Sequence, residues 1–352
     1  MNDQPYTVGP FSGPRYSYNA KRCGAGETPC AICGKAITDI DKAQTVCVVD
    51  GGDSWGDVDS DPYDAGYMGL HFVGPELPSE ASEALMVRVT NQAEIEELRD
   101  RGALFVLNHS GGKDSQTMTI LVRKLVPDRQ ILVIHAVLEG VVWEGDIEQI
   151  EATTEGLPLI LAHPVKTFFE MVERRQRWPS PQQRQCTSDL KRGPIEREIR
   201  RYLKQHPEYR GLVVNCMGMR AEESPGRAKL DTLKYSKRNS KAGREWYDWL
   251  PIHKLMTAEV FETIRAAGQT PHWVYAAGMT RLSCCFCIMA SRGDLRCAAG
   301  LKQDLYRRYV ETEKRIGHTV NMTGRGLEDV TGIPVDNGKA VTDGKEEKLE
   351  GT

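Results

Sequence analysis

Four short runs of consecutive apolar residues stand in the middle of the chain, separated by segments in which apolar residues recur at helical spacing. An unbroken apolar run is typical of a strand buried on both faces of a parallel sheet. The alternation predicts an α/β fold with a doubly wound parallel sheet and a ligand site at the carboxyl ends of its strands. The predicted strands cover residues 103–107, 131–137, 159–161 and 212–216. The predicted helices cover residues 91–102, 115–126, 146–154, 258–267 and the basic stretch 165–204, which has a break at 178–181.

The pattern changes on both sides of this region. Residues 1–80 are rich in Gly, Pro and Asp and show little periodicity, which predicts short β-structure in a small module that resembles a zinc ribbon. Residues 91–300 form the predicted main domain. Residues 301–352 are expected to form a C-terminal helix and a mobile tail, because the sequence from Thr323 onward is rich in Gly, Lys and Glu.

The composition is that of a soluble globular protein, with 40% hydrophobic and 27% charged residues in a chain of 352. It excludes a fully disordered chain, a collagen-like chain and a coiled coil. No stretch approaches the roughly 18 consecutive apolar residues of a membrane span. The first residues also lack the basic and apolar regions of a secretory leader. We therefore expect a cytoplasmic protein with no membrane partner.

Charge is distributed unevenly along a chain whose net charge is only −3. Residues 1–80 carry 12 acidic and 5 basic residues, a net charge of −7. Residues 165–245 carry 20 basic and 10 acidic residues, a net charge of +10. The basic stretch is expected to meet an anion such as nucleotide phosphates or a nucleic acid backbone, and solvated helix faces are the alternative.

A glycine-rich turn joins the first of these strands to the helix that follows it. Its sequence, NHSGGKDS over 108–115, offers two glycines whose N–H groups can point at an anion, two serine hydroxyls and the Lys113 ammonium. The N-terminus of the helix adds about half a positive charge. Asp114 would repel a phosphate unless it holds Mg²⁺ or a backbone N–H. The turn predicts a nucleotide phosphate site, although it lacks the spacing of a Walker A loop.

This turn resembles the SGGKDS pyrophosphate loop of the N-type ATP pyrophosphatases, which include sulfonucleotide reductases, ATP sulfurylase small subunits and tRNA thiolation enzymes. Further segments resemble the phosphoadenosine phosphosulfate (PAPS) reductase-like branch, above all its iron–sulfur ATP pyrophosphatases of DNA phosphorothioation. These segments are Cys186–Lys191 (CTxxLK), Gly218–Ser224 (GxRxxES), Trp249–Ile252 (WxPI) and Gly278–Cys287 (GxxRxxCxxC). The resemblance spans about residues 103–300 and implies a sheet of adenine nucleotide alpha-hydrolase (HUP) type.

The resemblance also implies roles for individual residues. Lys113, Asp114 and Arg220 would be catalytic, with ATP and Mg²⁺ as ligands. A surface ion pair with Glu222 or Glu223 is the alternative for the arginines of the site. The nucleotide-binding residues that it implies are Ser110, Gly111, Gly112, Lys113, Asp114, Ser115, His135, Arg220 and Arg227, and a buried histidine without a ligand is the alternative for His135.

Five cysteines in the second half of the chain are candidate metal ligands. Cys284 and Cys287 form a CxxC, and thiolates at that spacing suit Zn²⁺ or an iron–sulfur cluster. The resemblance implies a 4Fe–4S cluster with Cys186, Cys284 and Cys287 as ligands and either Cys297 or Cys285 as the fourth. Structural zinc and buried free thiols are the alternatives.

Four cysteines near the start, Cys23, Cys30, Cys33 and Cys47, resemble the ligands of a zinc ribbon or knuckle. The glycine after the CxxC at Cys30 permits the tight turn of a knuckle. The fourth ligand is open between Cys23, His71 and none, and a ribbon without Zn²⁺ is the alternative.

These features predict an enzyme that adenylylates a substrate with ATP, releases pyrophosphate and prepares the substrate for sulfur transfer. The expected acceptor is a nucleic acid, and the expected protein partner is a cysteine desulfurase or another sulfur donor. The alternatives are a sulfonucleotide reductase, an ATP sulfurylase-type enzyme and a non-catalytic zinc- and nucleotide-binding adaptor. The Lys-Asp pair of the loop and the lack of a cysteine after Cys297 argue against the reductase.

Overall fold

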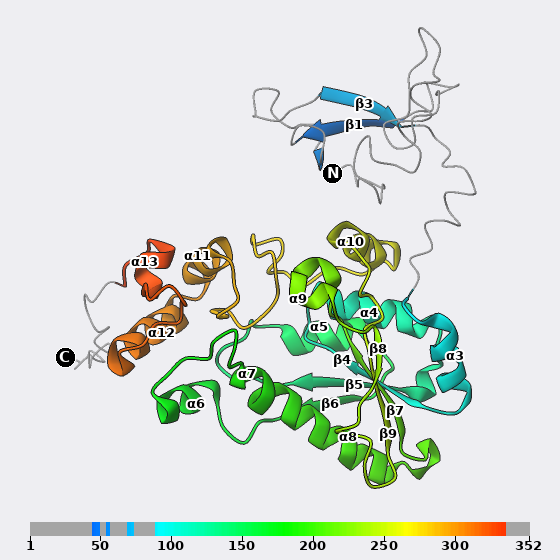
Figure 1. Ribbon diagram of the computed structural model, residues 1–352. Coiled ribbons are helices and arrows are strands. Elements are labelled where there is room, and N and C mark those ends of the chain that lie inside the picture. Colours follow the sequence, from blue (N-terminus) through cyan, green and yellow to red (C-terminus); the bar gives the residue numbers. More distant parts are fainter. Residues whose placement is uncertain (1–43, 50–53, 57–68, 74–88, 336–352) are drawn as a thin grey trace, which may run out of the picture.

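The computed structural model describes residues 44–49, 54–56, 69–73 and 89–335. Its main sheet has the strand order β6-β5-β4-β7-β9-β8 (Figure 1). All neighbouring strands pair in parallel except β8, which runs antiparallel to β9. The strands are β4 (Leu104–Asn108), β5 (Ile131–Ala136), β6 (Leu159–Ala162), β7 (Leu212–Met217), β8 (Leu233–Tyr235) and β9 (Glu245–Trp249). The mostly parallel sheet confirms the predicted α/β class.

Helices cover both faces of the sheet, as the alternating pattern predicts. Along β4, Phe105 and Leu107 enter the core under one set of helices, whereas Leu104 and Val106 enter the core on the opposite face. The first face is covered by α3 (Gln92–Asp100), α4 (Lys113–Arg123), α5 (Asp146–Thr153) and α10 (Thr257–Ala266). The opposite face is covered by α8 (Gly193–Gln205). Short helices are η3 (Asp128–Gln130), η5 (Pro207–Tyr209), η6 (Ala221–Glu223) and α9 (Pro225–Ala228).

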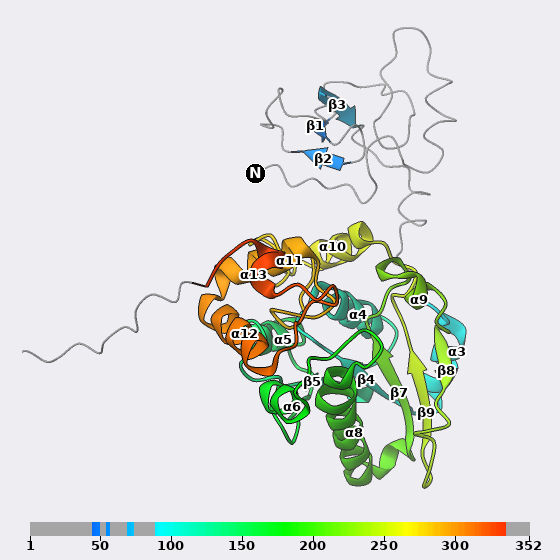
Figure 2. The same ribbon diagram turned by 60° about the vertical axis from the view of Figure 1, so that its left-hand side comes forward.

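A third apolar core joins the late cysteine segment to the helices around it. Trp178 stacks on Tyr309 with ring centroids 5.1 Å apart, and its indole N–H donates to the His318 carbonyl. The helices of this core are α6 (Phe168–Arg175), α11 (Arg292–Leu301), α12 (Gln303–Ile316) and α13 (Leu327–Thr331). Figure 2 shows α11, α12 and α13 gathered together. Part of the expected mobile tail is thus helical, because Leu327 and Val330 are buried in this core.

The basic stretch 165–204 is helical on both sides of its predicted break. α6 ends at Gln176 in the left-handed region (φ 51°), and the irregular segment that follows includes residues 178–181. Helical structure resumes with α7 (Gln185–Thr187) and the π-helix η4 (Ser188–Arg192), which run into α8. The fifth parallel strand, β9, was not predicted, because its sequence EWYDW places polar residues between the aromatic ones.

The N-terminal part contains a small antiparallel sheet in the order β2-β1-β3, which agrees with the expected short β-structure. Its strands are β1 (Gln44–Val49), β2 (Ser54–Gly56) and β3 (Gly69–Val73). Cys47 lies in β1, opposite Gly56 and Leu70. The other predicted zinc ligands, Cys23, Cys30 and Cys33, lie outside the described residues. Within the described ranges, no helix is long and apolar enough to cross a membrane.

Candidate active site

The glycine-rich turn connects β4 to α4 at the carboxyl edge of the sheet. Gly111 adopts φ +77°, a conformation that a side chain would strain. The Ser115 hydroxyl donates to the Gly112 carbonyl at 2.9 Å and accepts the Ser110 N–H at 3.1 Å. The turn is thereby closed on itself, with the N-terminus of α4 at its centre.

Three other segments approach this turn closely. A Cβ atom on Gly218, which follows β7, would lie 3.0 Å from the Asp114 carbonyl carbon and oxygen. A Cβ on Gly112 would lie 3.2 Å from the Tyr275 hydroxyl, and one on Gly111 would lie 3.3 Å from the Asp146 carbonyl. Two glycines of the turn and the glycine of the GxRxxES segment are therefore required by close backbone approach.

Lys113, the first residue of α4, is almost completely buried, with 2% of its surface exposed. Its Nζ donates to the Thr280 carbonyl at 3.3 Å and lies 5.2 Å from the centre of the Tyr275 ring. Its backbone N–H donates to the Tyr275 hydroxyl at 3.0 Å. The segment around 275–282 therefore closes over the loop lysine and holds its ammonium close to the turn.

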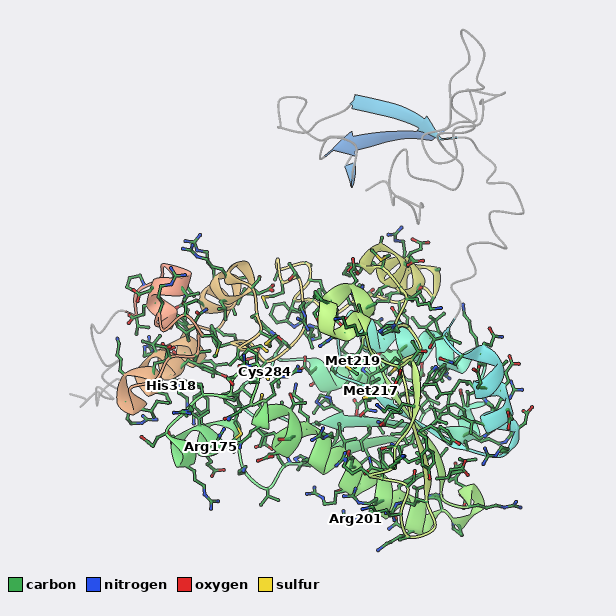
Figure 3. The ribbon with its side chains drawn as sticks, in the orientation of Figure 1. Arg175, Arg201, Met217, Met219, Cys284 and His318 are labelled. Carbon is green, nitrogen blue, oxygen red and sulfur yellow. The ribbon has the colours of Figure 1, made fainter. Side chains whose placement is uncertain are left out.

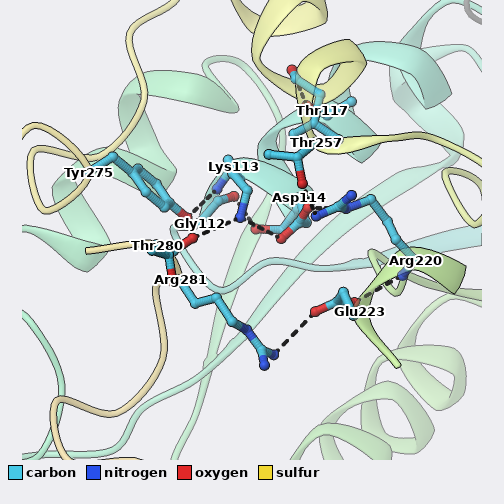
Figure 4. A network of polar contacts seen from close by, with 12 residues as sticks. Gly112, Lys113, Asp114, Thr117, Arg220, Glu223, Thr257, Tyr275, Thr280 and Arg281 are labelled. Atoms are coloured by element: carbon cyan, nitrogen blue, oxygen red, sulfur yellow. Dashed lines mark hydrogen bonds and ion pairs between the residues drawn. The ribbon is translucent and has the colours of Figure 1, made fainter. Parts of the chain in front are cut away.

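Asp114 is paired with cations on both oxygens. The Arg220 Nε donates to Oδ1 at 2.6 Å, and Lys113 Nζ lies 3.5 Å from Oδ2 (Figure 4). Arg220 is 3% exposed and also contacts Glu222 and the Thr257 hydroxyl. Burial disfavours its charge, yet the neighbouring carboxylates outweigh burial and raise the pKa of Arg220. Arg220 thus forms the ion pair with Glu222 that the sequence offered as the alternative, and its guanidinium also contacts the loop, while its role toward a nucleotide stays a prediction.

Glu223 holds two arginines on the wall opposite the turn. Its carboxylate pairs with Arg227 and with Arg281 Nη2, the latter at 3.1 Å, and accepts the Arg220 backbone N–H at 3.0 Å. Burial disfavours the charge of this carboxylate, but these donors prevail and hold the pKa of Glu223 below its usual range. The Arg227 guanidinium is therefore positioned by an ion pair, as the alternative allowed, and it still faces the cavity.

A cavity of about 630 Å³ opens between this wall and the turn. Its size is within the range of ligand sites, which is roughly 300–1,000 Å³. Loop residues, the carboxyl end of β5 with His135, the arginine pair held by Glu223 and three cysteines line it. The structure thus brings together most of the predicted site residues: Ser110, His135, Arg227, Cys186, Cys284 and Cys287 at the cavity, with Lys113, Asp114 and Arg220 beside it.

The cysteines divide into two sets. Cys186, Cys284 and Cys287 line the cavity, and the Cys284 sulfur is the main cause that raises the pKa of the adjacent Lys191. Burial raises the pKa of the Cys284 thiol to about 11. Cys285 and Cys297 are directed elsewhere. Cys285 is fully buried in the third core, whereas the Cys297 thiol donates to the Ala277 carbonyl at 3.1 Å. Among the described residues, no group of three His, Cys, Asp or Glu side chains is arranged to hold a metal ion.

Two histidines of the cavity are held in defined tautomers. The Gly111 N–H donates to His109 Nδ1 at 3.1 Å, which leaves the proton of neutral His109 on Nε2. His135 Nδ1 donates to the His109 carbonyl at 2.8 Å. Burial lowers the pKa of His109 to about 3 and also lowers the pKa of His135. His109 Nε2 is buried at the cavity and has no partner in the described residues.

The neutral His109 should give the protein an acid-sensitive stability. The unfolded chain binds a proton at this residue near pH 6.5 and the native chain only near pH 3, so stability falls as the pH decreases from about 6.5. Between pH 7 and pH 5 the unfolding free energy of the native sequence should drop by about 2 kcal/mol more than that of His109→Asn. Urea denaturation at both pH values measures this difference. The exposed His163→Asn should behave as the native sequence, and an equal drop in His109→Asn would contradict the buried neutral tautomer.

Sequence reasoning assigned no role in the site to Tyr275, Asp146 or His109. Tyr275 reaches the loop from 162 positions away, and nothing in its local sequence marks it. Asp146 is the first residue of α5 and was read only as a helix start. His109 belongs to the quoted loop, and its position directly before SGGKDS was the available signal.

Comparisons with known proteins agree with this arrangement. The family model of the phosphoadenosine phosphosulfate reductase domain matches residues 105–290. An uncharacterized protein of Methanocaldococcus jannaschii is 25% identical over 219 residues, which are 62% of this chain and 49% of that protein. An uncharacterized 37.8 kDa protein of Escherichia phage 186 is 27% identical over 129 residues, 36% of each chain. The chain thus matches half or less of the length of these curated relatives.

Solved structures are more distant. The phosphoadenylyl-sulfate (PAPS) reductase of Candida auris shares 12% identity over 59% of this chain and 96% of its own, with a TM-score of 0.37. The FMN adenylyltransferase of Candida glabrata shares 13% identity over 58% of this chain and 63% of its own, with a TM-score of 0.38. The family match is the decisive comparison, because it includes the loop, the arginine wall and the cavity cysteines and covers more than half of the chain. The chain belongs to the phosphoadenosine phosphosulfate reductase domain family.

Proposed function

We propose that this protein binds ATP in the cavity, transfers its adenylyl group to an acceptor and releases pyrophosphate, so that the acceptor can take up sulfur. The observation that carries the proposal is the intact SGGKDS turn, with Lys113 and Arg220 both directed at Asp114 beside the cavity (Figure 4). The turn supplies backbone N–H groups, a helix N-terminus and a fixed ammonium, which suit the charge of a departing pyrophosphate.

The distribution of cations favours ATP over a sulfonucleotide. A sulfonucleotide such as PAPS carries a single sulfate beyond its α-phosphate instead of β- and γ-phosphates, so it would present less negative charge to the loop. Arg227 and Arg281 line the other side of the cavity. Cations that line the cavity, together with the loop lysine beside it, suit a chain of phosphates that runs from the cavity to the loop.

The cavity cysteines are candidate ligands of an iron–sulfur cluster. Cys186, Cys284 and Cys287 would hold it, and a bound cluster would supply sulfur or electrons next to the nucleotide. Cys297 is engaged with a carbonyl outside the cavity, which disfavours it as a fourth ligand. The described residues contain no group of three side chains arranged to hold a metal ion, so metal analysis of the anaerobically purified protein is the test of a cluster against zinc.

The arginines around α8 support an anionic acceptor such as a nucleic acid. Glu196 pairs with Arg200 and Arg238, and Glu198 pairs with Arg197 and Arg201. Each carboxylate thus balances only one of two arginines, which leaves a surplus of positive charge around α8. Figure 3 shows Arg175 and Arg201 on the side of the molecule that carries α6 and α8. A nucleic acid held there would be bound through its phosphates, and a sulfur-donor protein would be needed as a partner.

Product analysis tests the proposal. Anaerobically purified protein is incubated with α-labelled ATP, Mg²⁺ and either duplex DNA or transfer RNA, and the labelled products are separated. Adenylylation predicts that the label on the nucleic acid, together with any labelled AMP that a nucleophile releases from it, equals the unlabelled pyrophosphate measured in a coupled assay, and that both depend on the nucleic acid. Labelled ADP, or no product in either mixture, would contradict the proposal. Release of sulfite from PAPS with a thiol reductant would instead support a sulfonucleotide reductase, the alternative favoured by the family match.

A further inference from the structure

Asp114, the loop carboxylate that could hold Mg²⁺, is already neutralised by protein cations. Asp114 accepts the Arg220 Nε at 2.6 Å on Oδ1 and lies 3.5 Å from the Lys113 ammonium through Oδ2. Lys113 and Arg220, the latter shared with Glu222, therefore neutralise this carboxylate before any ligand binds. A divalent cation at the phosphates needs another oxygen ligand that is not paired in this way.

Asp146 provides such a carboxylate. It is the first residue of α5, is 4% exposed and lines the same cavity as the turn. Its Oδ1 lies 3.6 Å from the point where a Cβ on Gly111 would stand, so the absence of a side chain there gives it direct access to the phosphate turn. Among the described residues, no lysine or arginine forms an ion pair with it.

The neighbouring histidine lies close to this carboxylate but forms no hydrogen bond with it. His272 Nε2 lies 3.2 Å from Asp146 Oδ1, but the two atoms do not form a hydrogen bond of good geometry. The Val274 N–H donates to His272 Nδ1, which places the single proton of a neutral imidazole on Nε2. Asp146 Oδ1 is therefore a buried oxygen that accepts no hydrogen bond among the described residues, and leaving such an atom unpaired costs free energy. A cation delivered to the cavity would remove that cost.

We infer that Asp146 is a ligand of a Mg²⁺ ion that also binds the phosphates of the nucleotide. This inference rests on the ATP binding proposed above. Mg²⁺ takes one or two carboxylates, keeps several waters and completes its shell with phosphate oxygens. A protein cage of three ligands is therefore not required, which agrees with the lack of any such group among the described residues. The Asp146 carboxylate lies beside Gly111 of the turn, where the phosphates would bind.

The test compares the affinity for α,β-methylene-ATP in excess Mg²⁺ and in EDTA, by equilibrium dialysis. The variants are Asp146→Asn, which keeps the shape of the side chain, and Glu148→Gln, which removes an exposed charge from the same helix. The native protein and Glu148→Gln should bind the analogue about tenfold more tightly in Mg²⁺ than in EDTA. Asp146→Asn should bind with the same affinity in both, and at least as tightly in EDTA as the native protein. Loss of the Mn²⁺ electron paramagnetic resonance signal in the presence of the analogue gives a second readout.

The outcomes separate this inference from the proposed function. If Asp146→Asn keeps the tenfold effect of Mg²⁺, or loses affinity equally with and without the metal, Asp146 is structural and the inference is wrong. If the native protein shows the effect of Mg²⁺ but releases no pyrophosphate from ATP, the inference stands and the proposed function fails. If the native protein binds the analogue under neither condition, both fail.

Discussion

Replacing Lys113 by methionine should lower ATP affinity and pyrophosphate release about a hundredfold or more. The ammonium is fixed beside the turn by the Thr280 carbonyl and the Tyr275 ring, so it meets a phosphate without reorganisation. Loss of one such preorganised group typically costs about 10²–10³ in rate. Methionine keeps most of the apolar length of the side chain, which limits the effect on packing. Equilibrium dialysis and a coupled pyrophosphate assay measure the two quantities.

The matched control for this variant is Lys124→Met. Lys124 is an exposed residue at the other end of the same helix, so it carries the same charge away from the turn. Its replacement should leave both quantities unchanged, and thermal unfolding should show that both variants are folded. An unchanged ATP affinity and rate of pyrophosphate release in a folded Lys113→Met variant would contradict the role of the loop in binding the phosphates.

Arg220→Ala should have the second largest effect, because it removes a cation that two carboxylates share. Asp114 and Glu222 would then face each other with a hydrogen-bond donor lost from each. Breaking a buried pair costs about 3–5 kcal/mol, and the partly exposed acids place this site near the lower end, at about 3 kcal/mol. Urea denaturation measures the loss, and ATP binding should fall with it.

A double-mutant cycle shows whether the loss arises from the ion pair. Asp114→Ala in the Arg220→Ala background should cost less than Asp114→Ala alone, because the carboxylate that it removes is no longer compensated. The exposed pair Arg123–Asp128 is the control, and Arg123→Ala should cost no more than about 1 kcal/mol. If the losses of unfolding free energy for Arg220→Ala and Asp114→Ala were additive, the ion pair drawn in Figure 4 would not couple the two residues, and the prediction would be wrong.

The elements with uninterrupted apolar runs could be predicted from the sequence. The strands β4, β5 and β7 are buried on both faces, so hydrophobicity alone marks them, and the half-buried edge strand β6 is marked by the same apolar run. β9 was not predicted because Glu245 and Asp248 interrupt its aromatic residues. Asp248 accepts hydrogen bonds from Asn215 and Trp246, and only the folded chain brings these donors to it.

The candidate site was predictable where its chemistry lies in consecutive residues. The SGGKDS turn and the CxxC carry their chemistry locally, and the structure places both at one cavity. Tyr275 and Asp146 reach the turn only through the folding of the segments that carry them. Cys297 shows that spacing in the sequence can also mislead. Its position ten residues after Cys287 suggested a ligand, but its thiol in α11 donates to the Ala277 carbonyl.

The most direct test of the central claim compares the binding of ATP and AMP to the native protein in the presence of Mg²⁺. If the turn over 110–115 holds the two outer phosphates, ATP should bind about a hundredfold more tightly than AMP, which is about 2.7 kcal/mol. Inorganic pyrophosphate should compete with ATP, and Lys113→Met should remove most of the difference. Equal affinity for ATP and AMP, with no competition by pyrophosphate, would contradict the account.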